Sequence, residues 1–220
     1  MVAAIGVFLL AQGVFAPGAA AQTITATDAG YYNSLGIHDA ANTNHITGVE
    51  PGLVYHGFLV FDIPAGAGFA SVQLSIPTAG VDSGPNTLEL YDVSTSAATV
   101  RAGAVAGPAG IAIHNDLGSG TLLGAAPGLT GSSVASVNLN AAGVAAVNAA
   151  RGGPLVIGMR NGTVESAADF IFGVSAIGPI QLIATPLAPV PTLSEWAMIL
   201  FGTGLAGVAG LMLWRRPRLA

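Results

Sequence analysis

The sequence contains no cysteine and no lysine, and charged residues make up only 8% of its 220 positions. Without cysteine the chain has no disulfide framework and no thiolate metal site. Between Gln22 and Pro189 it carries ten acidic residues against three arginines, a net charge of −7. Nucleic-acid binding needs Lys and Arg to displace counterions from phosphates, so this acidic segment argues against it.

The chain begins with an apolar run from Val2 to Phe15, followed by Ala19-Ala20-Ala21. Three small residues before Gln22 fit the cleavage site of a secretory signal peptide, although no basic residue precedes the run as is usual. The run is also short for a membrane span, which needs about 20 apolar residues. We therefore expect residues 1–21 to be a signal peptide that is removed on export, with a second membrane anchor as the alternative.

The C-terminal part contains a second apolar run, residues 196–214, without a single charged residue. As a helix with a rise of about 1.5 Å per residue it spans roughly 28 Å, close to the hydrocarbon thickness of a bilayer. A tryptophan stands at each end, and Arg215, Arg216 and Arg218 follow at once. Aromatic ends and a basic flank predict a transmembrane helix whose tail, residues 215–220, is cytoplasmic. A buried core helix is the alternative.

The residues that lead into this run are Pro191, Thr192, Leu193, Ser194, Glu195 and Trp196. Together with the apolar run and the arginines they resemble the IPTL-CTERM sorting signals of bacteria, which are relatives of the PEP-CTERM signals. Val190 stands where that pattern usually has Ile, and the resemblance covers only residues 190–220. It implies an inner-membrane intermediate in a Gram-negative bacterium, processed by an exosortase-like membrane enzyme. The product would reach the cell surface or the extracellular matrix.

The middle of the chain has short apolar and β-branched runs separated by Gly, Pro, Asn and Asp, a spacing typical of an all-β sandwich. We expect a domain at residues 22–185 with seven to nine strands, joined to the apolar run by a proline-rich linker and sorting motif at 186–195. A short helix should follow Asn140, which can cap it. Long loops are expected over 97–131. The clearest strands are predicted at 55–63, 71–76, 87–93, 134–139, 154–160, 169–174 and 180–184.

The segments Tyr55–Asp62 and Ala70–Leu74 have a second, looser resemblance, to jelly-roll modules of exported bacterial proteins and to carbohydrate-binding modules. The segments Asn138–Asn140 and Gly152-Gly153 are similar to segments of domains that precede PEP-CTERM-type tails. The resemblance implies an antiparallel sandwich of jelly-roll type and a candidate role in glycan binding. It carries no binding residue over to this chain.

Motifs for catalysis are absent from the sequence. It has neither a Gly-x-Ser-x-Gly elbow nor a His-Glu-x-x-His run. Two pairs of acids, Asp39 with Glu50 and Glu89 with Asp92, could in principle support glycoside hydrolysis. The second pair falls on opposite faces of a regular strand. We therefore expect no enzyme and no catalytic cofactor, and a hydrolase has the least support.

Two binding sites are suggested by residue type alone. Asp28, Asp39 and Glu50 lie in an Asn-rich region and offer the oxygen ligands of a structural Ca²⁺ ion. A solvated turn-rich loop is the alternative. Tyr31 and Tyr32 are the aromatic residues left outside the predicted core strands, so they are candidates for stacking on a sugar.

Two functions follow from these features. The first is an exported, surface-sorted, non-enzymatic protein of the envelope or extracellular matrix. The alternative is a carbohydrate-binding module that acts on exopolysaccharide. In both cases the expected partners are the membrane and the sorting enzyme, and for the second also an extracellular polysaccharide.

Overall fold

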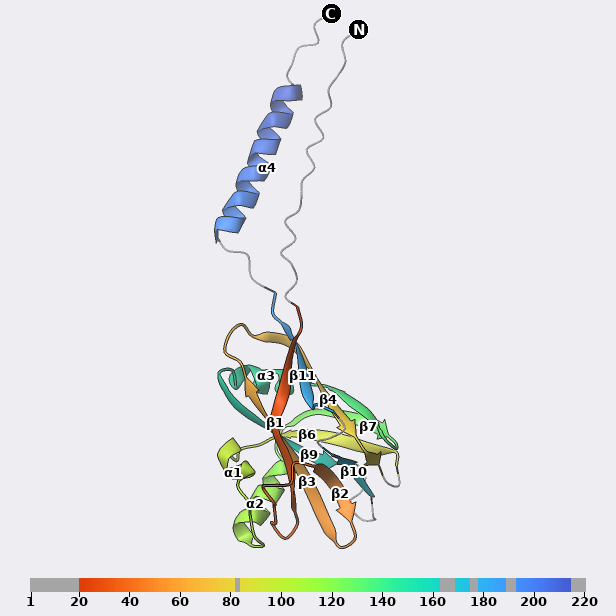
Figure 1. The fold of residues 1–220 in the computed structure, drawn as a ribbon. Helices are drawn as coiled ribbons and strands as arrows, with labels where there is room; N and C mark the ends of the chain where they lie inside the picture. Colours follow the sequence, from red (N-terminus) through yellow and green to blue (C-terminus); the bar gives the residue numbers. More distant parts are fainter. Residues whose placement is uncertain (1–19, 82–83, 163–168, 175–177, 189–192, 215–220) are drawn as a thin grey trace, which may run out of the picture. The chain divides into compact units, whose positions relative to one another are not determined.

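The computed structural model describes residues 20–81, 84–162, 169–174, 178–188 and 193–214. The chain divides into a compact domain, Ala19–Leu187, and a separate unit that contains the helix α4, Leu193–Trp214. The described part of the domain consists mainly of antiparallel strands (Figure 1). The all-β, sandwich-like architecture predicted from the sequence is therefore confirmed.

One layer of the domain, here named sheet A, is built from four antiparallel strands. Its order is the first part of β1, then β11, β4 and β8. The strands are β1 (Gln22–Asn33), β11 (Gln181–Pro186), β4 (Phe69–Thr78) and β8 (Ser133–Asn138). Inward and outward side chains alternate on β4, with Val72, Leu74 and Ile76 buried as predicted.

The other layer, sheet B, has β3 at its centre. β3 pairs with β1 on one edge and with both β9 and β2 on the other. Beyond β9 the sheet is extended by β6, which pairs with β9, and by β7, which pairs with β6. Beyond β2 it is extended by β10, which pairs with β2, and by β5, which pairs with β10. Its strands are β2 (His45–Glu50), β3 (Leu53–Ile63), β5 (Gly80–Val81), β6 (Asn86–Asp92), β7 (Leu122–Leu129), β9 (Gly153–Asn161) and β10 (Asp169–Gly173). A register shift between Ala26 and Asp28 lies where β1 passes from sheet A to sheet B. A bulge of this kind bends a strand, which allows β1 to belong to both layers.

The main hydrophobic core fills the space between the two sheets. Sheet A contributes Leu74, Ile76 and Val137, and sheet B contributes Phe61 and Ile157. The helix α3 (Ala141–Ala149) packs against this core where predicted, and the Asn140 side chain accepts a hydrogen bond from the Gly143 N–H at 2.9 Å. The strand predicted at 71–76 is longer at both ends, because β4 runs from Phe69 to Thr78 and includes Pro77.

A second core covers the opposite face of sheet B. Phe58, Val60 and Tyr32 point to this face and meet side chains of α1 (Ala97–Arg101) and α2 (Pro108–Leu117). Residues 97–131 were expected to form long loops. That expectation is wrong for 97–101 and 108–117, because the apolar positions of β3 and β1 on this face need a cover and the helices α1 and α2 supply it. It is also wrong for 122–129, which form β7.

Three strands of the domain, β1, β2 and the two-residue β5, were not predicted. β1 contains Asp28, Gly30 and Asn33, and β2 contains Gly48, residue types that are depleted in strands. β1 and β2 are held by long-range pairing: β1 lies between β3 and β11, and β2 between β3 and β10. Partner strands far along the chain therefore decide their conformation.

The separate unit contains α4, which includes the apolar run at 196–214. Its large apolar side chains are exposed, Leu200 and Phe201 to 70% each. None of the helices in the described ranges is long and apolar enough to cross a membrane, so the transmembrane helix predicted at 196–214 is not found.

Candidate functional site

The two tyrosines expected to bind a sugar lie on β1 and point to opposite faces of sheet B. Tyr32 is fully buried in the second core, with its ring 4.8 Å from the ring of His38 and 6.2 Å from that of Phe58. Burial raises the pKa of its hydroxyl. A side chain without exposed surface cannot stack on a sugar, so Tyr32 is removed from the candidate site.

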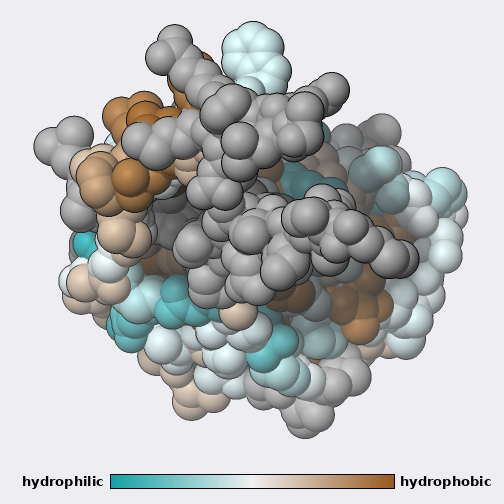
Figure 2. Space-filling model, turned by 90° about the horizontal axis from the view of Figure 1, so that it is seen from above, coloured by the Kyte–Doolittle hydropathy of each residue, from teal (hydrophilic) through white to brown (hydrophobic). Residues whose placement is uncertain are grey.

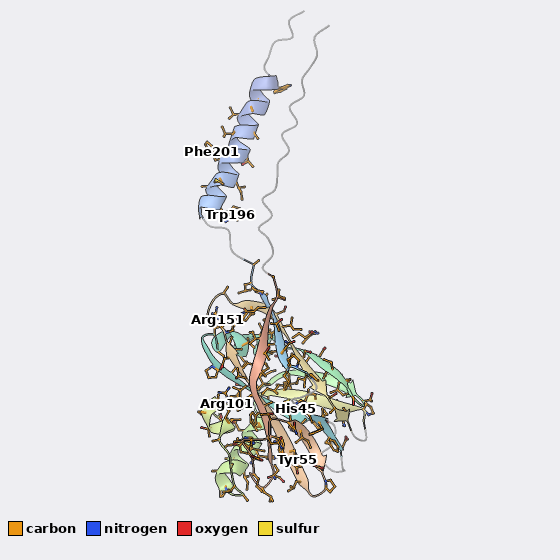
Figure 3. All side chains as sticks on the ribbon, viewed as in Figure 1. His45, Tyr55, Arg101, Arg151, Trp196 and Phe201 are labelled. Atoms are coloured by element: carbon orange, nitrogen blue, oxygen red, sulfur yellow. The ribbon has the colours of Figure 1, made fainter. Side chains whose placement is uncertain are left out.

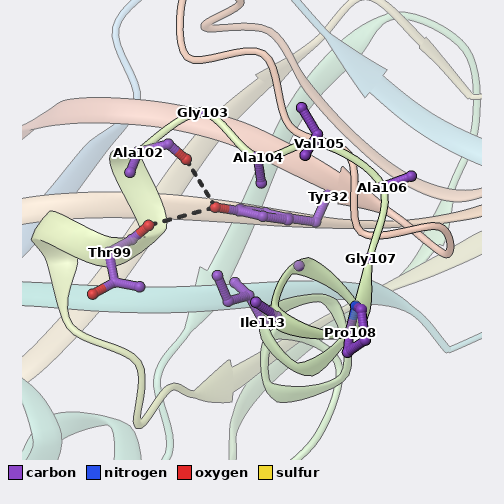
Figure 4. Close-up of a pocket in the computed structure, with 12 residues that line it drawn as sticks. Tyr32, Thr99, Ala102, Gly103, Ala104, Val105, Ala106, Gly107, Pro108 and Ile113 are labelled. Carbon is purple, nitrogen blue, oxygen red and sulfur yellow. Dashed lines mark hydrogen bonds between the residues drawn. The ribbon is translucent and has the colours of Figure 1, made fainter.

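The Tyr32 hydroxyl has a structural contact instead. It lies 3.1 Å from the carbonyl oxygens of Val100 and Ala102, to either of which it can donate. Figure 4 shows the hydroxyl at the end of α1, beside a hollow of 390 Å³ lined mostly by residues 102–110. The lining has no charged side chain. Tyr32 therefore holds α1 against sheet B.

Tyr31 points the other way and meets Tyr55 of β3. The two ring centroids are 5.5 Å apart, with an interplanar angle of 72°, which is an edge-to-face contact. Both rings are partly exposed, and Figure 3 labels Tyr55 at the β2–β3 end of the domain. The Asn42 side-chain amide donates to the Tyr31 hydroxyl at 3.1 Å. These groups, together with Glu50, are named the aromatic corner.

Glu50 contributes a negative charge beside the Tyr55 hydroxyl in the aromatic corner. Burial, the negative charge of Glu50 and the neighbouring Tyr31 together raise the pKa of the Tyr55 hydroxyl. The corner therefore presents two phenols, an amide and the acidic side chain of Glu50 around two aromatic rings. This combination can pack against the C–H face of a sugar ring and accept or donate hydrogen bonds to its hydroxyls.

Tyr55 was not predicted as a site residue, because it lies in a strand that was expected to be wholly core. Gly57 follows two positions later on the same face and pairs with Tyr31. It makes no opening beside the two rings, because an added Cβ there would come within 2.6 Å of the Met159 side chain. The partial exposure of the Tyr55 ring therefore had no signal in the sequence.

The three acids proposed for calcium are engaged separately. Asp28 forms an ion pair with Arg101, with 3.4 Å between Oδ2 and Nε. The Asp39 side chain accepts from the Ala41 N–H at 3.0 Å, and Glu50 ends β2. Across the described ranges, no three His, Cys, Asp or Glu side chains come together to hold a metal. The expected calcium site is therefore not formed by these residues.

His45, the first residue of β2, is a buried polar side chain of a different kind. It is 2% exposed, and neither ring nitrogen has a hydrogen-bond partner. The ring lies over Gly173 of β10, where an added Cβ would come within 2.2 Å of it and 2.7 Å of the Pro77 carbonyl oxygen. Burial lowers the pKa of His45 to about 4, so the ring is neutral at physiological pH.

The predicted sorting motif lies only partly within the described residues. Leu193 to Trp196 form the first turn of α4. Pro191, Thr192, Arg215, Arg216 and Arg218 lie outside the described residues, as does the signal peptide except for its end. Figure 3 labels Trp196 and Phe201 on α4, and hydrophobic side chains at the surface are brown in the view from above (Figure 2).

Comparison with known proteins adds no assignment to these features. No protein-family model matches the chain, and no curated protein matches it. The argument for function therefore comes from the residues of this chain alone.

Proposed function

We propose that this chain is an exported, non-enzymatic protein of a Gram-negative envelope or extracellular matrix, sorted through its C-terminal segment. The observation that supports this is α4, a separate helix whose large apolar side chains are exposed along its described length. Exposed apolar surface on this scale marks a site that a partner or a membrane covers. The sorting-type residues 191–196 lead into this helix, which suits recognition by a membrane-embedded, exosortase-like enzyme.

The compact domain is the cargo in this proposal. It has its own core between sheets A and B and a second core under α1 and α2. Its cores do not include α4.

The sorting proposal predicts that processing depends on the motif. In the native host, a Pro191→Ala/Trp196→Ala variant should accumulate uncleaved in the membrane fraction, because the enzyme no longer recognises its segment. Fractionation and mass spectrometry of the mature protein measure this. Trp214→Ala is the matched control, because it removes the other tryptophan of the helix and should still be processed. An intact 196–214 peptide in the released wild-type protein would overturn the proposal.

A second candidate function is carbohydrate binding, and the aromatic corner is the observation that favours it. Two partly exposed tyrosine rings stand next to the Asn42 amide and the acidic side chain of Glu50. The corner lies on the domain, so it would be displayed wherever the sorted domain is displayed. We propose exopolysaccharide as its ligand and a jelly-roll type for the sandwich. The pairing of strands distant in sequence, such as β4 with β8 and β1 with β11, supports that type.

The carbohydrate proposal predicts that Tyr55→Ala weakens glycan binding by roughly 2- to 13-fold, since an aromatic contact contributes about 0.5–1.5 kcal/mol. A glycan array followed by titration of the best ligand measures the change. Tyr91→Ala is the control, because Tyr91 is also partly exposed but lies on β6. Equal affinities for the wild type and Tyr55→Ala would exclude the aromatic corner as the site.

A further inference from the structure

The outward side of sheet A has an unusual composition. Its four strands place their outward residues in register, so that these form rows across the sheet. One row is Thr25, Gln181, Ser75 and Ser136, from β1, β11, β4 and β8 in that order. The next row is Thr23, Ile183, Gln73 and Asn138. All eight side chains are exposed or partly exposed. They define what we name the outer face of sheet A.

This face has no charge, although the segment from Gln22 to Pro189 carries a net charge of −7. Seven of the eight side chains are hydroxyls or amides, and each of these can both donate and accept hydrogen bonds. Neighbouring strands lie about 4.8 Å apart and the rows about 6.6 Å apart, as in any sheet. The face therefore presents a regular grid of neutral donors and acceptors, about 15 Å across its four strands.

Part of the grid is held in place before any ligand arrives. The Gln73 Nε2 atom donates to the Asn138 Oδ1 atom at 2.9 Å, across the β4–β8 pair. This contact fixes two long side chains in the plane of the face. Groups that are already ordered lose less conformational entropy when they bind a partner.

A hollow of 460 Å³ adjoins one end of the same face. Its lining includes Ser75 and Gln181 of the first row, with Thr78, Ser133 and the rings of Pro77 and Pro179. The volume falls within the usual range of about 300–1,000 Å³ for ligand pockets. Hydroxyls, an amide and apolar rings meet there, and the lining has no charged residue.

We propose that the outer face of sheet A binds a neutral polysaccharide, with one sugar ring seated in the hollow. A neutral sugar chain offers hydroxyl donors and acceptors for the grid, and C–H faces for the two prolines, Ile183 and the exposed Val134. An acidic polysaccharide would find no cation on this face and would be repelled by the acidic domain. The inference is independent of sorting and of the aromatic corner.

The test uses the purified full chain with insoluble cellulose and chitin as neutral polymers and polygalacturonate as an acidic one. Wild-type protein should bind a neutral polymer, not the acidic one. Its retention should hardly change between about 0.05 and 0.5 M salt, because no ionic contact is involved. A Thr25→Glu/Ser136→Glu variant places two charges on the face and should bind at least 10-fold more weakly. Thr121→Glu, an exposed change outside the face, should bind like the wild type.

Thermal unfolding of each variant checks that the domain remains folded. The substituted positions are exposed, so we expect each variant to fold. Failure of the wild type to bind either neutral polymer would overturn the proposal. So would equal binding by the wild type and the Thr25→Glu/Ser136→Glu variant. Loss of binding in Tyr55→Ala but not in that variant would place the ligand at the aromatic corner instead. Neither result bears on sorting, which is measured in cells.

Discussion

Replacing Phe58 with alanine should lower the free energy of unfolding by about 3–5 kcal/mol, the usual cost of deleting a buried phenylalanine side chain. Phe58 has no exposed surface and lies in the second core, between β3 and the helices α1 and α2. Its ring contacts His38 and Tyr32, with centroid distances of 5.2 and 6.2 Å. Deleting the ring would leave a cavity beside both neighbours, at the contact between sheet B and the two helices.

Denaturant unfolding of the full chain, followed by circular dichroism, measures this loss. Phe170→Ala is the matched control, because Phe170 is only partly buried on β10 and should cost clearly less. The difference between the two variants reports how firmly α1 and α2 cover sheet B. Similar small losses for both would show that the two helices do not seal a core there.

Acidification should destabilise the domain through His45. The pKa of this histidine is about 4 in the folded protein, because burial without a hydrogen-bond partner disfavours the charged ring, and about 6.5 in the unfolded chain. The unfolded state therefore binds more protons between these two values. The stability that comes from neutral His45 is complete above pH 6.5 and is lost progressively as the pH falls to about 4, by about 3 kcal/mol.

A His45→Leu variant isolates this contribution, since leucine does not titrate. As the pH falls from 7 to 4, the free energy of unfolding should decrease more for the wild type than for His45→Leu. His38→Leu is the control. The pKa of His38 is also lowered by burial, but its contact with the Tyr31 carbonyl oxygen and the charges of Asp28 and Asp39 oppose the shift. Parallel pH profiles for wild type and His45→Leu would contradict the prediction.

The aromatic corner could be predicted only in part from the sequence. Tyr31 and Tyr32 are equivalent in the sequence, yet one residue on a strand reverses the face to which a side chain points. Only the pairing of β1 with β3 decided that Tyr32 is buried and that Tyr31 meets Tyr55. The grouping of Asp28, Asp39 and Glu50 was also wrong, because three different elements place these side chains. Asp28 lies on β1, Asp39 in the loop between β1 and β2, and Glu50 at the end of β2.

The sequence by itself determined the features that depend on local pattern. The alternation of β4, the core character of β3 and the Asn140 cap are each encoded within a few residues, and the structure confirms them. The tertiary structure alone decided the features that depend on distant partners. These are the strands β1 and β2, the helices α1 and α2 and the in-register outer face of sheet A. The reason is physical, because weak local propensities give way to the burial and backbone pairing that distant segments provide.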